Sequence, residues 1–340
     1  MRTFLRFLGR FFLTLLVTVV ILVGGIYLLM YIVCKGPSPS AGERFVLSVR
    51  ETSMIGFLAN WFYTDEEIAA IVEKSAMKQE QEQTDTSMVT VVSKGEGTKE
   101  EQEAALTQPE IEVVDIKGAT YSGKMLIVKD PSRVFVGKIP QFGSGDGIPA
   151  NKIGELYNAV GGINGGEFVD GAVTDTSTPA ALVMSEGAIV YGDVNTVGHI
   201  TGFTKDNILV LGTMSGQEAL NMGMRDCVSV NPGIGPFLII NGESQDGAGM
   251  AGGLNPRTAI GQRADGSVLL LAVDGRQANS LGASFSDMIE IMMEYDAVNA
   301  SCMDGGTSTQ IFYEGEVINN PYSPWGARPC PTAFLVGGAE

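Results

Sequence analysis

The longest uninterrupted apolar run in the chain lies near its N-terminus. Residues 11–34 contain no charged side chain and consist mainly of Leu, Val, Ile and Phe. As a helix rising 1.5 Å per residue, this run would be about 36 Å long, enough to cross a hydrocarbon core of about 30 Å. A cleaved signal peptide is the alternative, but its apolar core typically spans only about 7 to 15 residues. The pattern therefore predicts a transmembrane anchor at residues 11–34.

Charged residues beside this run predict its orientation. Arg2, Arg6 and Arg10 precede it, whereas only Lys35 follows it closely. Because Lys and Arg concentrate on the cytoplasmic side of membrane helices, we expect residues 1–10 to form a short cytoplasmic tail. The chain after residue 34 is then expected to lie outside the cytoplasm, on the extracellular side.

Polar residues dominate much of the next segment. Thr64 and Glu67 match a capping box and predict a helix start. Apolar residues between positions 54 and 62 form a patch that could dock on the following domain or lie along the membrane. Residues 73–110 are poor in large apolar residues and rich in Glu, Gln, Lys, Ser and Thr, so they cannot bury a core alone. We interpret residues 35–110 as a juxtamembrane helix and an acidic, partly disordered stalk.

Short apolar runs separated by turns recur from residue 111 onward. Helical patterns are few and do not alternate regularly with strand patterns, which argues against a doubly wound Rossmann sheet. Glycine, at 44 of 340 residues, is almost double its usual share of about 7% and favours many turns. We therefore predict an α+β domain with a mixed or antiparallel sheet at residues 111–340. Its expected strands include residues 123–128, 132–136, 181–184, 188–191, 208–212, 237–240 and 267–273, and its expected helices are residues 148–160, 215–224 and 284–295.

The overall charge limits the partners of this domain. The formal net charge is −17, which argues against nucleic acid or an anionic membrane face as a long-range partner because like charges repel. An anionic substrate would have to be held by local arginines against the average electrostatic field.

Cysteine and histidine are scarce. Beyond the apolar run the cysteines are Cys227, Cys302 and Cys330, so at most one intramolecular pair can form among them. We hypothesise that Cys302 and Cys330 form a disulfide, since an oxidising exterior would permit it. The single histidine, His199, lies in an alternating, strand-like context, and a structural role is its default interpretation. One histidine without a CxxC pair does not make a conventional zinc site.

Three short strings between residues 255 and 309 carry most of the candidate chemistry. They are NPRTAIG at 255–261, VDGR at 273–276 and MDGGTST at 303–309. Glycine lets a ligand approach the main chain closely, Arg offers a planar fork for phosphate or carboxylate, and Asp can act as base or nucleophile. An Asp beside Gly at a strand end is also an ordinary turn residue. The combination predicts a site for an anionic, hydroxyl-rich substrate.

These strings, in this order, resemble the phosphodiester glycosidase family. Four further segments fit the same resemblance, which spans roughly residues 110–336: GINGG at 162–166, GIGPFLIING at 233–242, VINNP at 317–321 and RPCPTAF at 328–334. Any one of these motifs also marks ordinary turns, so the specificity lies in their number and order. The resemblance implies a hydrolase that cleaves sugar-1-phosphodiester linkages, with a cell-surface polysaccharide or glycoconjugate as the expected substrate.

Candidate roles follow from the chemistry that such a reaction requires. The leaving group is a phosphate monoester, already stable as an anion, so phosphate charge stabilisation and nucleophile activation are the larger needs. We expect Arg257 and Arg276 to bind the phosphate and Asp304 and Asp274 to form the carboxylate pair, with the assignment of nucleophile and base left open. The remaining substrate-binding candidates are Thr258, Asn164, Gly165, Gly166, Gly305, Gly306, Thr307 and Ser308.

Two departures from the family pattern concern the sugar pocket. Glu167 follows Asn-Gly-Gly where members often carry glycine or an aromatic residue, and Cys302-Met303 precedes Asp-Gly-Gly where many carry Asn-Leu. A non-catalytic glycan-binding or exopolysaccharide assembly factor is therefore the alternative function. A Ca²⁺ or Mg²⁺ site built from the aspartates and the carbonyls of the glycine turns is a further hypothesis.

Overall fold

The computed structural model describes residues 2–51, 55–75, 83–91, 110–169, 175–230, 237–245, 252–323 and 326–338. The chain divides into two compact units, Met1–Glu73 and Lys74–Glu340, each of which has its own internal packing. Most of the expected stalk, residues 76–82 and 92–109, lies outside the described residues.

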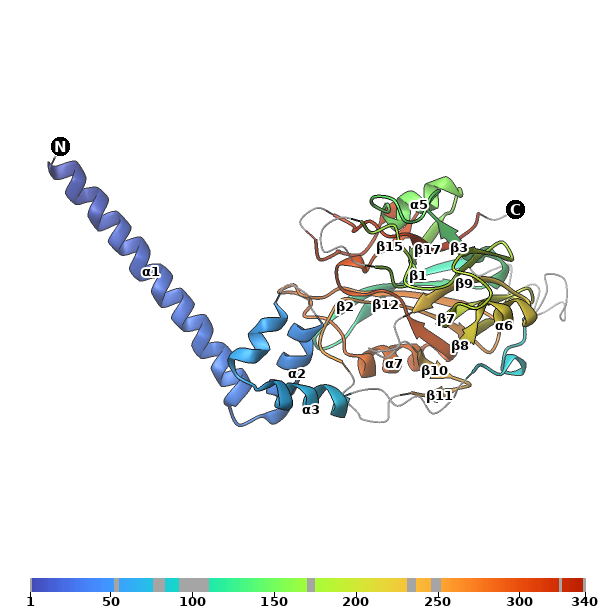
Figure 1. The fold of residues 1–340 in the computed structure, drawn as a ribbon, viewed down its shortest axis with the longest axis horizontal. Coiled ribbons are helices and arrows are strands. Elements are labelled where there is room, and N and C mark those ends of the chain that lie inside the picture. The colour runs from blue at the N-terminus through green and yellow to red at the C-terminus, as the bar shows by residue number, and fades with distance from the viewer. Residues whose placement is uncertain are drawn as a thin grey trace. The chain divides into compact units, whose positions relative to one another are not determined.

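The first unit is helical. Helix α1, Arg2–Lys35, is continuous in Figure 1 and contains the apolar run, and by length and composition it could cross a membrane or act as a signal sequence. The predicted capping box at the start of α3, Asp65–Ser75, is confirmed. The Thr64 N–H donates to Glu67 Oε2 at 2.9 Å, and the Glu67 N–H donates to Thr64 Oγ1 at 3.2 Å. The unit also contains α2, Pro39–Arg50, and the 3₁₀ helix η1, Gly56–Trp61.

Part of the apolar patch at residues 54–62 packs against α1. The ring of Tyr27 lies 6.4 Å from that of Trp61 and 5.5 Å from that of Phe62, measured between centroids. Phe57 and Trp61 nevertheless remain more than half exposed. The patch therefore covers the C-terminal turns of α1 and keeps an aromatic outer surface.

The second unit is an α+β domain, as predicted, and all its paired strands are antiparallel. Its seven-stranded sheet has the order β1 (Ile111–Lys117), β2 (Ser122–Val128), β13 (Val268–Val273), β12 (Arg257–Arg263), β14 (Ala297–Cys302), β10 (Phe237–Ile240) and β11 (Glu243–Ser244). One five-stranded sheet has the order β16 (Glu316–Val317), β15 (Ile311–Tyr313), β4 (Gly161–Asn164), β17 (Thr332–Val336) and β3 (Val134–Lys138). The other has the order β6 (Ala188–Tyr191), β5 (Val183–Ser185), β9 (Met224–Val230), β7 (Val197–Thr204) and β8 (Leu209–Ser215).

Hydrophobic clusters lie on both faces of the seven-stranded sheet. One face shares a core with the two smaller sheets, and the other packs against helix α7, Phe285–Glu294 (Figure 1). The Ser284 hydroxyl caps α7 by accepting from the Asp287 N–H at 3.2 Å. The three predicted helices of this domain are present in shortened form, because α5 spans Ala150–Leu156 and α6 spans Gly216–Asn221.

Strand register brings the three candidate motifs to one end of the seven-stranded sheet. Arg257, the first residue of β12, pairs with Val273, the last residue of β13. Ala259 pairs with Cys302, the last residue of β14. Residues just before β12 and just after β13 and β14 therefore meet at the same sheet edge, although they are up to about 50 positions apart in sequence.

Residues 83–91, which composition alone predicts to be stalk, pack on the folded domain. The Thr84 N–H donates to the Leu211 carbonyl at 3.1 Å, and the Leu211 N–H donates to Thr84 Oγ1 at 3.0 Å. Farther along, the Thr90 N–H donates to the Ala264 carbonyl at 2.8 Å. Because β8 is the outer strand of its sheet, this segment covers an edge that would otherwise present unpaired backbone groups.

The hypothesis of a Cys302–Cys330 disulfide is wrong. Both residues are thiols, as are Cys34 and Cys227, and all four are buried. Cys302 belongs to the cluster between the seven-stranded sheet and α7, whereas Cys330 belongs to a separate cluster that includes α5. Placement in different cores explains why neighbouring motifs do not bring the two sulfur atoms together.

Thr84→Val is expected to destabilise the domain by about 1–3 kcal/mol, the cost of leaving the buried Leu211 N–H without an acceptor. Chemical denaturation of the protein would measure this free energy of unfolding. Thr90→Val is the matched control because the Thr90 side chain is exposed. Equal stability of both variants and the wild type would show that residues 83–91 do not belong to the folded domain.

Candidate active site

The centre of the candidate site is the turn that follows β14. Asp304 leaves the strand and its N–H donates to the Gly165 carbonyl at 3.2 Å, while the Gly306 N–H donates to the Pro256 carbonyl at 2.9 Å. The 3₁₀ helix η5, Gly306–Ser308, continues the turn. Gly306 has φ +61°, in the left-handed region that favours glycine. The Asn-Gly-Gly, Asn-Pro-Arg and Asp-Gly-Gly motifs are thus joined through their backbones.

Asn164 holds this turn with a fully buried side chain. Its Nδ2 donates to the Asp304 carbonyl at 2.8 Å, and its Oδ1 accepts from Thr258 Oγ1 at 2.8 Å and from the Gln310 N–H at 3.1 Å. Asn164 and Thr258, both expected to bind substrate, therefore direct these polar atoms at the protein. They position the turn that carries Asp304.

Two arginines lie on the Gly306–Ser308 turn. Arg276 donates from Nε and Nη2 to Asn255 Oδ1 at 3.1 and 2.9 Å, and a Cβ added to Gly306 would lie 3.4 Å from Arg276 Nη1. Arg328 Nη1 donates to Thr307 Oγ1 at 3.3 Å. Two guanidinium groups beside one glycine-containing turn provide a local cationic site in a strongly acidic chain.

Arg328 was not among the candidate residues, although it opens the closing motif RPCPTAF. The signal that could have found it is its place at the start of a segment that fits the family resemblance. The thiol pKa of Cys330 is raised to about 12, mainly by burial. The charge of Asp304 contributes to this rise and the charge of Arg328 opposes it, so both groups lie within electrostatic range of the same sulfur.

Arg257 lies in a different environment from Arg276. It is buried, its guanidinium stacks 3.8 Å from the ring centroid of Phe285, and its Nε donates to the Ala283 carbonyl at 3.2 Å. Successive residues of a strand face opposite sides of a sheet, so Arg257 points toward α7 while Thr258 points toward Asn164. The structure brings Arg276 and Arg328, rather than Arg257, to the Gly306 turn.

Gly165 and Gly166 allow close contact between backbones. A Cβ on Gly165 would lie 2.3 Å from Thr332 Oγ1, and one on Gly166 would lie 2.2 Å from the Ser229 carbonyl oxygen. Neither distance is compatible with a side chain. These glycines therefore seat the Asn164 segment against β17 and β9.

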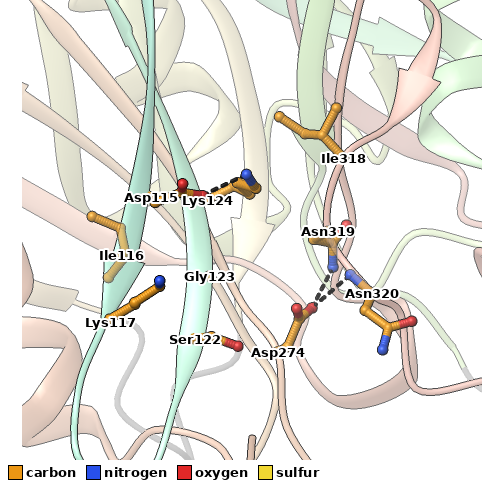
Figure 2. Close-up of a pocket in the computed structure, with 10 residues that line it drawn as sticks. All are labelled: Asp115, Ile116, Lys117, Ser122, Gly123, Lys124, Asp274, Ile318, Asn319 and Asn320. Atoms are coloured by element: carbon orange, nitrogen blue, oxygen red, sulfur yellow. Dashed lines mark hydrogen bonds and ion pairs between the residues drawn. The ribbon is translucent and has the colours of Figure 1, made fainter. Parts of the chain in front are cut away.

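Asp274 is buried at the end of β13. Its Oδ1 accepts from Asn319 Nδ2 at 2.9 Å and from the Asn320 N–H at 3.0 Å (Figure 2). Asn319 Nδ2 also donates to the Thr309 carbonyl at 3.3 Å, which links Asp274 to the turn after Asp304. Burial raises the pKa of Asp274, and the hydrogen bonds from Asn319 and Asn320 partly oppose that rise.

His199 on β7 hydrogen-bonds Thr213 through Nδ1, and burial lowers its pKa. Among the residues that the structure describes, no three His, Cys, Asp or Glu side chains gather in an arrangement that could hold a metal ion.

Comparison with known proteins identifies relatives of this arrangement. A family model described as phosphodiester glycosidase matches residues 157–337, slightly more than half of the chain. The mouse N-acetylglucosamine-1-phosphodiester alpha-N-acetylglucosaminidase is 25% identical over 227 residues, which cover 62% of this chain and 43% of the mouse protein. The SPbeta prophage-derived protein YomE of Bacillus subtilis is 44% identical over 66 residues, which cover 19% of this chain and 10% of that protein. The chain thus spans less than half the length of these curated relatives.

A solved structure shares the fold. The zebrafish N-acetylglucosamine-1-phosphodiester alpha-N-acetylglucosaminidase catalytic domain, auto-inhibited by its pro-peptide, matches with a TM-score of 0.54 and 21% sequence identity. The match covers 68% of this chain and 85% of the zebrafish chain. The likeness establishes the architecture of the α+β domain.

Asp274→Asn is expected to change the pH dependence of stability. A carboxyl whose pKa is raised by folding stabilises the protein below its unfolded pKa of about 3.9, and this contribution is lost as pH rises through the folded pKa. The melting temperature of Asp274→Asn minus that of the wild type should therefore increase from about pH 4 to about pH 7. Thermal unfolding at a series of pH values measures this difference.

Asp115→Asn, on β1, is the control with the opposite sign. Hydrogen bonding and charge from Lys124 lower the pKa of Asp115. The wild type should therefore gain stability relative to Asp115→Asn as pH rises. If the difference in melting temperature between Asp274→Asn and the wild type did not change with pH, the Asp274 carboxyl of the wild type would titrate as it does in the unfolded chain.

Proposed function

Because this chain belongs to the phosphodiester glycosidase family, we propose that its α+β domain hydrolyses the bond between the anomeric carbon of a sugar and a phosphodiester. The observation that carries the proposal is the position of Asp304 on a glycine turn that Arg276 and Arg328 flank. The activity of the relatives named for this reaction supports the same assignment.

The proposed division of roles follows from the charges that develop in the reaction. The anomeric C–O bond breaks, and its electron pair leaves with the phosphate monoester. Arg276 and Arg328 stabilise the phosphate oxygens, and the Thr307 and Ser308 hydroxyls lie beside Arg328 for further hydrogen bonds. Arg257, stacked on Phe285, supports the start of β12 from the other face of the sheet.

Asp304 is the proposed reacting carboxylate. In an inverting reaction it would accept a proton from the water whose oxygen bonds to the anomeric carbon, and in a retaining reaction it would bond to that carbon before water replaces it. Both routes require that the Asp304 carboxylate is held in a fixed orientation. The backbone bond from Asp304 to Gly165 and the Asn164 amide on its carbonyl supply that rigidity.

Helix α1 is proposed to anchor this domain to the cell membrane with residues 35–340 outside. The arginines before the apolar run favour this orientation. The pair of Tyr27 on α1 and Trp61 on η1 supports an interfacial position for the end of α1, since Trp and Tyr concentrate at membrane surfaces. A surface polysaccharide or glycoconjugate is then the proposed substrate.

Asp304→Asn should reduce hydrolysis of a sugar-1-phosphodiester by about 100-fold or more while the melting temperature stays near that of the wild type. Asn fits the same turn but lacks a basic carboxylate. Release of free sugar, followed with and without a chelator, measures the reaction and its metal dependence. Unchanged turnover would remove Asp304 from the mechanism.

Arg328→Lys serves as the comparison variant because it keeps the positive charge and loses the planar fork. It should lower kcat as well as raise KM, because the phosphate gains negative charge as the C–O bond breaks. A raised KM with unchanged kcat would restrict Arg328 to substrate binding.

Protease added to intact cells or right-side-out vesicles should digest the domain that follows α1. The predicted orientation puts the N-terminal arginines in the cytoplasm and the domain outside the cell, where the protease can reach it. Immunoblotting against a C-terminal tag measures the digestion, and a cytoplasmic protein of the same cells is the control for leakage. Full protection of the domain in intact cells would reverse the proposed topology.

A further inference from the structure

The short helix η1 of the first unit keeps an apolar surface exposed. Ile55, Phe57 and Trp61 are 41%, 57% and 53% exposed, and we call them the η1 surface. The rings of Phe57 and Trp61 pack edge to face, with their centroids 6.0 Å apart. Single exposed apolar residues are common, but neighbouring aromatic rings that form one exposed patch are typical of a surface that binds something.

The opposite side of η1 belongs to the core of the same unit. Ala59 is fully buried. It belongs to a hydrophobic cluster together with Val46 and Val49 of α2 and Ile68 of α3. Because this close packing fixes η1 against both helices, the η1 surface cannot turn inward without breaking the core. Whatever covers the η1 surface must come from outside this helical cluster.

Contacts with α1 fix the level of the η1 surface along that helix. Tyr27 precedes Lys35, the last residue of α1, by eight positions, which corresponds to about 12 Å at 1.5 Å per residue. The ring of Tyr27 contacts those of Trp61 and Phe62, at 6.4 and 5.5 Å between centroids. The chain has therefore folded back, and η1 lies beside the last turns of α1 rather than beyond its end.

Further contacts join the end of α1 to the helices that follow it. The Tyr63 hydroxyl donates to the Cys34 carbonyl, and Lys35 Nζ lies 4.1 Å from the centroid of the Tyr63 ring. A Cβ added to Gly42 would lie 2.2 Å from the Tyr63 hydroxyl oxygen and 3.0 Å from the Cys34 carbonyl oxygen, so α2 can approach only because this residue is glycine. The end of α1 is thus part of the folded unit, and the level of η1 is fixed with it.

The side chains of α1 at this level are themselves apolar and exposed. Leu28, Leu29 and Ile32 are each more than half exposed. A helix that enters a hydrocarbon core of about 30 Å at Phe11 crosses it in about 20 residues, which places Tyr27 just inside the outer boundary of that core. Trp and Tyr concentrate at this boundary. The surroundings that suit the last turns of α1 therefore suit the η1 surface as well.

The charge of this segment indicates how such a contact would be held. Residues 36–73 contain six acidic and two basic side chains, so anionic lipid headgroups would repel them. Aromatic and aliphatic side chains instead gain from transfer into the boundary between headgroups and acyl chains, whatever the headgroup charge. The contact should therefore form with zwitterionic lipid and should not weaken at high salt.

From these contacts we propose that the η1 surface inserts into the outer leaflet of the membrane that α1 spans. The inference rests on the proposed anchoring by α1 and adds a second membrane contact beside it. Interfacial aromatic residues help to set the tilt and rotation of a spanning helix. Two adjoining contacts would therefore hold α2, η1 and α3 in one orientation at the membrane surface.

Trp61 is a natural probe for this contact. The chain contains two tryptophans, Trp61 and Trp325, so Trp325→Phe leaves Trp61 as the single fluorophore. The full-length variant is placed in phosphatidylcholine nanodiscs with or without bromine on the acyl chains, because bromine quenches tryptophan only at close range. We expect Trp61 to lose most of its emission in the brominated nanodiscs and little of it to iodide in the buffer. The loss should be the same at high salt.

Three variants calibrate the measurement, each made together with Trp61→Phe and Trp325→Phe. Leu22→Trp introduces the probe at an exposed position in the middle of α1 and should be quenched by bromine. Val197→Trp on β7 introduces it at an exposed position of the enzyme domain and should be quenched by iodide. Phe57→Trp should behave like Trp61, because the two rings share the η1 surface.

The outcomes separate this inference from the proposed anchoring. If iodide quenches Trp61 and bromine does not, while bromine quenches Leu22→Trp, the η1 surface lies in water and the inference is wrong. Protection of Trp61 from both quenchers would show that protein covers the surface, which overturns the inference as well. If bromine fails to quench Leu22→Trp, α1 does not span the bilayer, and the proposed anchoring fails together with the inference. Hydrolysis of the sugar-1-phosphodiester is measured independently of all three results.

Discussion

The buried amide of Asn164 is the contact on which the candidate site depends. It joins β4 of one sheet to Thr258 on β12 of another and to the backbone of Asp304. An isolated buried amide is costly, so its donor and acceptor must both find partners, and here those partners are parts of the site. Displacement of one sheet relative to the other would break these bonds. The geometry of Asp304 is therefore tied to the packing of the whole domain.

The local charge at this site is opposite in sign to the net charge of the chain. The chain carries a formal charge of −17, yet Arg276 and Arg328 lie on a turn of three residues. Electrostatic attraction between nearby groups dominates over distant charges, which salt screens within about 10 Å. An acidic protein can therefore hold a phosphate where guanidinium groups are fixed by neighbours such as Asn255.

Much of this arrangement could be predicted from the sequence, and the parts that could not have physical reasons. The α+β class, the Thr64 capping box and the family follow from local patterns and motif order. The sequences of strands β12 and β14 show no clear alternation of apolar and polar residues, because both strands bury polar side chains. Gln262 accepts from the Leu209 N–H at 2.7 Å, and Asn299 accepts from the Asn241 N–H at 3.0 Å. These partners are distant in sequence, so alternation of apolar and polar residues does not reveal them.

The two candidate aspartates show the same limit at the site itself. Each precedes glycine at the end of a strand, so the local sequence pattern does not distinguish the two aspartates. The fold places Asp304 and Arg328 within electrostatic range of the Cys330 thiol, whereas it buries Asp274 against Asn319. Burial favours the neutral form of a carboxyl, which raises the pKa of Asp274. Register across β12, β13 and β14 therefore gives the two aspartates different surroundings, and on this difference rests the proposal of Asp304 as the reacting carboxylate.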